Sequence, residues 1–185
     1  HGTGILGEHG SGLCERQQVQ ERVDIIISTA SKALGSLGGI VTAKKVVIDT
    51  LVNHARSLIY TTAPPPSQVA SIAAALTVIA NEPWRRERLA KISQRVREAV
   101  IEMGFELPAL TVATPIIPLL TESAESAVAL SNYLNSQGIH APAIRPPTVA
   151  PNASRVRLSL RCDLQDPQID HLIQTLEQWR KQNLS

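Results

Sequence analysis

The chain has 185 residues, enough for one ordinary domain or two small ones, and its 43% apolar and 18% charged content excludes a disordered protein. A net charge of +2 gives no reason to expect a nucleic-acid or membrane-surface partner, and no apolar run is long enough to span a bilayer. The two cysteines, Cys14 and Cys162, lie far apart, fit no metal-binding spacing and favour a reduced, cytoplasmic setting.

The first part of the chain, residues 1–82, is predicted to alternate short apolar strands with helices. An apolar spacing of helical period predicts one helix over residues 43–57. Three prolines at positions 64–66 indicate a rigid approach to the N-terminus of a second, alanine-rich helix. The strands are expected near residues 23–28, 38–43 and 58–61.

The second part, residues 83–185, is predicted to be a small α+β domain with an open sheet. Its first helix, over 84–104, carries an apolar stripe of Leu89, Ile92, Val96 and Val100, and its charges are expected to form a solvated face. In RVRLSL, apolar residues alternate with polar ones, which predicts one covered and one wet face. The remaining elements are expected as strands over 114–120, 139–144 and 155–161, and helices over 125–138 and 166–182.

Lys32 stands where the first predicted strand, expected to be buried, gives way to a glycine-rich loop, in VDIIISTASKALGSLGG. A nucleotide P-loop needs its glycines before the lysine, whereas here they follow it, so that motif does not match. An amine at a strand end can instead form a Schiff base with an aldehyde, and Ser28, Thr29 and Ser31 would supply hydroxyls to a neighbouring phosphate. The residues alone leave two interpretations open, an ordinary surface lysine and a covalent anchor for pyridoxal phosphate.

A family resemblance is carried by five motifs in order: HGTGILGEHGSG, TASKALGSLGG, SLIYTTAPPP, AIRPPTVAP and RVRLSL. Together they resemble the α-oxoamine synthases, pyridoxal phosphate (PLP) enzymes of the aspartate-aminotransferase fold (fold type I), over residues 1 to about 178. The resemblance implies that residues 1–82 are the C-terminal part of a large α/β PLP-binding domain, followed by a small α+β domain at 83–185.

Within the family, HGTG and AIRPPT are most similar to members that condense L-alanine with pimeloyl-CoA or a pimeloyl-carrier protein in biotin biosynthesis. Two alternatives stay open. One is a sister acyltransferase that uses glycine with acetyl-CoA, and the other is a non-catalytic remnant that serves as an interaction module.

The resemblance also assigns roles around the cofactor. Lys32 matches the lysine that binds PLP covalently and removes the α-proton of the amino acid. Thr29 matches a hydroxyl that binds the PLP phosphate, and His1 matches a histidine beside the cofactor's phenolic oxygen. Thr61 and Thr62 lie in a segment that, in the family, reaches the phosphate in the neighbouring subunit, which implies a homodimer.

Substrate roles fall in the second part of the chain. Arg145 matches the arginine that binds the amino-acid carboxylate, for which a planar guanidinium is well suited. Thr148 matches a threonine of the acyl-substrate site. The family's carboxylate for the PLP pyridine nitrogen is expected three positions before His1, outside this chain, so we expect the chain alone to be inactive.

Overall fold

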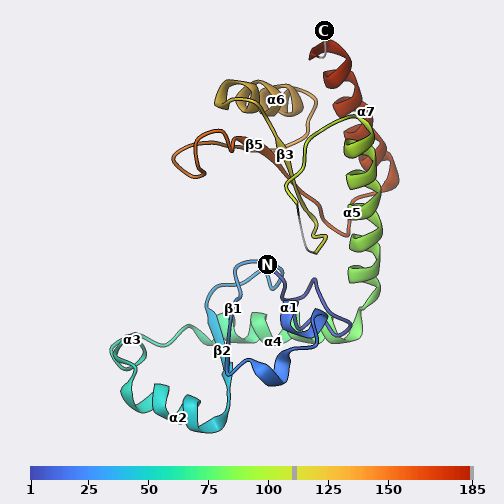
Figure 1. Ribbon diagram of the computed structural model, residues 1–185. Coiled ribbons are helices and arrows are strands. Elements are labelled where there is room, and N and C mark those ends of the chain that lie inside the picture. Colours follow the sequence, from blue (N-terminus) through green and yellow to red (C-terminus); the bar gives the residue numbers. More distant parts are fainter. Residues whose placement is uncertain (110–111, 184–185) are drawn as a thin grey trace. The chain divides into compact units, whose positions relative to one another are not determined.

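The computed structural model describes residues 1–109 and 112–183, and the chain divides into two compact units, His1–Arg86 and a second that starts at Glu87. Within the described ranges, none of the helices combines the length and the apolar character needed to cross a bilayer. Each unit is described by itself below (Figure 1).

The first unit is built around an antiparallel hairpin. Strand β1 (Ile25–Thr29) pairs with β2 (Gly39–Ala43), with Ile25 opposite Ala43 and Thr29 opposite Gly39. Both strands lie close to their predicted positions. The other elements of this unit are α1 (Leu13–Arg16), the 3-10 turn η1 (Gln20–Arg22), α2 (Lys45–His54), α3 (Arg56–Ile59) and α4 (Pro66–Asn81).

The strand predicted near residues 58–61 is wrong. Helix α3 occupies this stretch, and the backbone amides of Leu58 and Ile59 both donate to the carbonyl of Ala55 at 2.9 Å. A strand must give its amides and carbonyls to a neighbouring strand. Since neither β1 nor β2 pairs with this segment, local hydrogen bonds close it into a helical turn.

The expected burial of β1 is also wrong in this structure. Ile27 is 77% exposed and Ile25 46% exposed, because a hairpin of two strands has too few neighbours to cover its faces. Throughout residues 1–86, all of which are described, Ala30 and Leu34 are the only buried apolar side chains. The small core of this unit therefore lies in the loop that joins β1 to β2.

The second unit is a three-stranded antiparallel sheet with helices, as predicted. Strand β5 (Arg155–Ser159) lies between β3 (Ile116–Leu120) and β4 (Ala143–Ile144). Helix α6 (Ala124–Ser136) packs against β4 and β5 (Figure 1). The other two helices are α5 (Trp84–Glu102), which begins just before this unit, and α7 (Asp166–Asn183).

The predicted apolar patterns of this unit are confirmed. Val156, Leu158 and Leu160 are buried, whereas Arg157 and Ser159 on the same strand are exposed. The four residues of the α5 stripe are buried as well. Alternation of period two and spacing of period 3.6 therefore identified the covered faces correctly.

Strand β4 is shorter than the predicted strand at 139–144. The amide of Ile139 donates to the carbonyl of Leu134 at 2.9 Å, so this residue closes the end of α6. Pro142 has no N–H to give to a ladder, although its carbonyl accepts from Arg157 at 3.0 Å. Only the two residues after Pro142 pair fully with β5.

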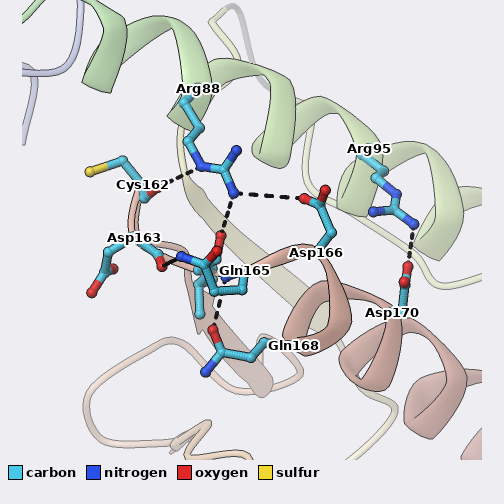
Figure 2. A network of polar contacts seen from close by, with 9 residues as sticks. Arg88, Arg95, Cys162, Asp163, Gln165, Asp166, Gln168 and Asp170 are labelled. Carbon is cyan, nitrogen blue, oxygen red and sulfur yellow. Dashed lines mark hydrogen bonds and ion pairs between the residues drawn. The ribbon is translucent and has the colours of Figure 1, made fainter.

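A solvated face does not describe all the charges of α5. Arg88 donates from Nε to the carbonyl of Cys162 at 3.0 Å and from Nη2 to the carbonyl of Leu164 at 2.8 Å. Its Nη2 also lies 3.6 Å from a carboxylate oxygen of Asp166 in the first turn of α7 (Figure 2). Arg88 thus ties α5 to the loop between β5 and α7.

Candidate active site

Lys32 lies in the loop that joins β1 to β2. Buried Ala30 and Leu34 flank it and anchor the loop, and Lys32 itself is exposed. The amide of Ala30 donates to the carbonyl of Gly38 at 2.9 Å, and the amide of Gly35 donates to the carbonyl of Lys32 at 3.0 Å. The backbone around the lysine is therefore fixed, and its amine is left open to a ligand.

Hydroxyl groups surround the start of this loop. The hydroxyls of Thr29 and Ser31 are hydrogen-bonded at 2.9 Å, and the amide of Ser31 donates to Thr29 Oγ1 at 3.3 Å. Both residues are exposed, and within the described chain Lys32 Nζ has no hydrogen-bond or ion-pair partner. A lysine whose amine is unpaired within the described chain thus follows directly after a pair of exposed, hydrogen-bonded hydroxyl residues.

The N-terminal loop that starts with His1 contacts both strand β1 and the Lys32 loop that follows it. Thr3 Oγ1 donates to Ser28 Oγ on β1 at 3.2 Å. Gly4 has a φ of +78°, and a Cβ at this position would lie 3.0 Å from the Cβ of Ala33, the residue after Lys32. His1 is exposed at the start of this loop. The structure therefore places Thr29 and Lys32 in one loop and His1 in the segment that packs on it.

Glu15 holds the far side of the N-terminal loop, a role that the sequence did not reveal. Its carboxylate accepts hydrogen bonds from the backbone amides of His9 and Ser11, each at 2.8 Å, and lies 2.7 Å from Nδ1 of His9. The hydrogen bond from the His9 amide is the main reason that the pKa of Glu15 falls to about 2. A Cβ at Gly7 would lie 2.0 Å from Glu15 Oε2, so the carboxylate fits only beneath a glycine.

Arg86 holds the same loop from the other side. Its Nη2 donates to the carbonyl of Glu8 at 2.7 Å, and its Nη1 donates to the carbonyl of Ile79 near the end of α4 at 2.6 Å. A Cβ at Gly10 would lie 2.9 Å from Ile79. A glycine-rich stretch followed closely by an acidic residue is the local signal that could have pointed to Glu15. In contrast, nothing near Arg86 in the sequence indicates a contact with Glu8.

Arg145 and Thr148 share one tight turn in the second unit. The amide of Thr148 donates to the carbonyl of Arg145 at 3.0 Å, directly after β4, and both residues are exposed. Between them stands the Pro146–Pro147 pair, whose peptide bond is cis. Two prolines restrict the backbone, so the Arg145 side chain projects from a backbone of fixed conformation.

Thr61 and Thr62 lie apart from these groups in the hydrogen-bonding pattern. They follow α3, both are exposed, and within the described chain neither side chain hydrogen-bonds the Lys32 loop. The predicted residues of the first unit thus form one cluster at Lys32 and a separate pair after α3.

The family of the chain is decided by a family model described as aminotransferase class I and II, which matches residues 1–176. The chain belongs to this family. The match runs through both compact units, so this aminotransferase-family chain carries Lys32 and Arg145 within one matched region.

Curated relatives of this aminotransferase-family chain carry a common name. The 8-amino-7-oxononanoate synthase of Pseudomonas paraeruginosa is 39% identical over 183 residues, which is 98% of this chain and 45% of the relative. The protein of the same name from Alkalilimnicola ehrlichii is 38% identical over 179 residues, or 96% of this chain and 45% of the relative. The chain thus spans less than half the length of these relatives.

Solved structures confirm the predicted aminotransferase-like PLP fold, with its α+β second part. Serine palmitoyltransferase of Sphingomonas wittichii superposes with a TM-score of 0.92 and 29% identity over 98% of this chain and 46% of that chain. A structure titled as serine palmitoyltransferase with a PLP internal aldimine gives 0.92 at 25% identity, with the same coverage. The 8-amino-7-oxononanoate synthase of Francisella tularensis shares the fold, with a TM-score of 0.87 over 100% of this chain and 54% of that chain.

Proposed function

We propose that the protein containing this chain is a PLP-dependent C-acyltransferase that joins L-alanine to a pimeloyl thioester, releases CO2 and the thiol, and forms 8-amino-7-oxononanoate. The observation that carries the proposal is Lys32, whose exposed amine has no partner in the described chain and which directly follows the hydroxyl residues Thr29 and Ser31. The identity of 38–39% to synthases of this name supports the choice of substrates.

The chemistry of the donor set fits PLP. A primary amine can bind an aldehyde carbon, and paired hydroxyls can donate to phosphate oxygens. At Gly35, directly after buried Leu34, a Cβ would meet nothing within 4 Å, so the loop leaves open space on that side. When bound, PLP would supply an electron sink for the bonds at the α-carbon of the amino acid.

The chain's own residues would then divide the work. Lys32 Nζ would hold the cofactor through its aldehyde carbon and would take the α-proton of the amino acid. Thr29 would donate to the phosphate, and His1 would interact with the phenolic oxygen. Arg145 binds the substrate carboxylate with two parallel hydrogen bonds and so sets its orientation, while Thr148 contacts the acyl substrate.

We also propose how the protein is organised. We assign residues 1–82 to the C-terminal part of a large PLP-binding domain and residues 83–185 to a small domain. Exposed apolar side chains support a homodimer, in which Thr61 and Thr62 reach the partner's phosphate site. Those next to the two threonines are Leu58, Ile59 and Tyr60, which are 50%, 47% and 78% exposed. Cys14 and Cys162 are free thiols, which supports a cytoplasmic location.

The decisive test is covalent labelling. The full gene product that contains these residues is incubated with PLP, reduced with borohydride and digested, and mass spectrometry locates the phosphopyridoxyl group. We expect the group on Lys32, and no label on the Lys32→Ala variant. Because Lys45 is exposed and lies in α2, Lys45→Ala is the matched control and should keep the label. A wild-type protein without label on Lys32 would contradict the proposal.

Substrate choice is tested separately. Release of the free thiol is measured with L-alanine, glycine or L-serine, each with pimeloyl-CoA, pimeloyl-carrier protein or acetyl-CoA, and mass spectrometry identifies the amino ketone that each pair forms. We expect turnover with L-alanine and a pimeloyl thioester. Turnover with glycine and acetyl-CoA alone would assign the protein to a sister acyltransferase, and labelling without any turnover would favour a non-catalytic module.

A further inference from the structure

The N-terminal loop, residues 3–12, has an unusual number of fixed points for a segment without regular structure. Within the loop, the amide of Gly4 donates to the carbonyl of Gly10 at 2.7 Å, and the amide of Gly12 donates to the carbonyl of Leu6 at 2.9 Å. These two bonds close the loop on itself. Its shape is therefore set by its own backbone, and its position must be set by what holds it from outside.

Two charged side chains hold it from outside. The Glu15 carboxylate accepts hydrogen bonds from the amides of His9 and Ser11, and the Arg86 guanidinium donates one to the carbonyl of Glu8. Hydrogen bonds to charged groups are stronger than those between neutral groups. A carboxylate therefore accepts hydrogen bonds from two amides of the loop, those of His9 and Ser11, and a guanidinium donates to one carbonyl, that of Glu8.

The first residues of the loop contact the segment that contains Lys32. Gly4 packs against Ala33, the residue after Lys32, and Thr3 hydrogen-bonds Ser28, four residues before Lys32. The Ile79 side chain lies against both Gly4 and Gly10, since a Cβ at these glycines would lie 3.1 Å and 2.9 Å from it. The carbonyl of Ile79 accepts a hydrogen bond from Arg86. A shift of the loop would therefore be passed to the backbone on either side of Lys32.

We propose that Glu15 and Arg86 are positioning residues, which hold the N-terminal loop against the Lys32 loop and so fix the lysine for its reaction with the cofactor. Neither side chain is placed at the cofactor itself. The inference rests on the proposed role of Lys32. It adds that the geometry at Lys32 depends on two charges that act through the loop's backbone.

The test uses the full gene product and three variants. Glu15→Gln removes the negative charge and one hydrogen-bond acceptor. Arg86→Lys keeps the positive charge but cannot donate to both carbonyls at once. Gly7→Ala displaces the Glu15 carboxylate without changing its chemistry. Asp49→Asn and Arg16→Lys are matched controls, because Asp49 belongs to an exposed ion pair with Lys45 and Arg16 is exposed. Thermal unfolding checks that every variant is folded at the assay temperature.

Hydrogen exchange is the first measurement, made without PLP. We expect the amides of residues 3–12 to exchange faster in all three variants and at the wild-type rate in both controls. The second measurement is the rate of phosphopyridoxyl labelling at Lys32 and, with substrates, kcat/KM. We expect a loss of about 10- to 100-fold in kcat/KM, as for a displaced reacting group, with the KM for the amino acid little changed.

The double variant Glu15→Gln/Arg86→Lys separates a shared positioning role from general destabilisation. Two residues that act through one loop should be non-additive, so the double variant should lose less than the product of the two single losses. Additive losses, or faster loop exchange with unchanged labelling and kcat/KM, would overturn the inference while the proposed function stands. A wild-type protein that takes no label on Lys32 would instead overturn the proposed function.

Discussion

Arg88 Nε donates a 3.0 Å hydrogen bond to the carbonyl of Cys162, which joins helix α5 to the loop before α7 (Figure 2). A second bond from Nη2 reaches the carbonyl of Leu164 at 2.8 Å. Because these carbonyls lie between the end of β5 and the first turn of α7, one side chain fixes the connection between the two elements. The apolar contacts of the same loop come from Leu160, which is buried, and Leu164, which is half-buried.

Replacing this arginine should therefore weaken the second unit. We expect Arg88→Ala to lower the free energy of unfolding by about 1–3 kcal/mol, since it leaves two carbonyls without a charged donor. Urea unfolding of the chain measures the change. Arg161→Ala removes an exposed ion pair with Asp163 in the same loop and should cost less than about 0.5 kcal/mol. Equal costs for the two variants would contradict the importance of Arg88.

A matched pair of leucines tests the small core of the first unit. Leu34 is 4% exposed, and Leu37, three residues later in the same loop, is 66% exposed. We expect Leu34→Ala to cost about 2–4 kcal/mol, because it empties a buried site, whereas Leu37→Ala should cost less than about 0.5 kcal/mol. Urea unfolding of the 185-residue chain compares them. A larger loss for Leu37→Ala would show that the loop is packed differently.

Much of this fold could be predicted from the sequence where the pattern is periodic. The α5 stripe and the alternation in β5 identified their buried faces, because burial against one neighbour imposes the period of the element itself. The strand expected at 58–61 failed for a related reason. An apolar run indicates a strand only when another strand is available to pair with it, and the neighbours of a strand are not written in its own residues.

The site divides in the same way. Lys32 could be found because its chemistry is local, with hydroxyls before it and glycines after it. Arg86 could not be found, because the carbonyl that it binds belongs to Glu8, 78 residues earlier. Glu15 is an intermediate case, since its partners His9 and Ser11 are close in sequence, but its role depends on a loop conformation that only the structure shows.

The lowered pKa of Glu15 predicts how the free energy of unfolding depends on pH. Its pKa falls from 4.5 to about 2 in the folded chain, so its contribution to stability is complete above pH 4.5 and is lost as the pH falls toward 2. We expect Glu15→Gln to lower the free energy of unfolding by about 1–3 kcal/mol near neutral pH and by progressively less in acid. Urea unfolding at a series of pH values measures the gap. The exposed-pair variant Asp49→Asn should show a small gap, and a Glu15→Gln gap that widens in acid would be incompatible with this assignment.

Arg145 makes a prediction about substrate binding that is independent of the cofactor. Arg145 lies in an exposed turn, which is closed by a 3.0 Å hydrogen bond from the Thr148 amide to the Arg145 carbonyl. A lysine at this position would supply a single point charge in place of a planar pair of donors. We expect Arg145→Lys to raise the KM for L-alanine by about 10- to 100-fold, as for the loss of a charged hydrogen bond, while borohydride labelling of Lys32 is unchanged. Steady-state kinetics of the full gene product measure this. Arg157→Lys changes an exposed arginine on β5 and serves as the control. Carboxylate binding is the only role proposed for Arg145, and it requires that the KM for L-alanine rise in the variant. An unchanged KM for L-alanine would therefore exclude Arg145 from carboxylate binding.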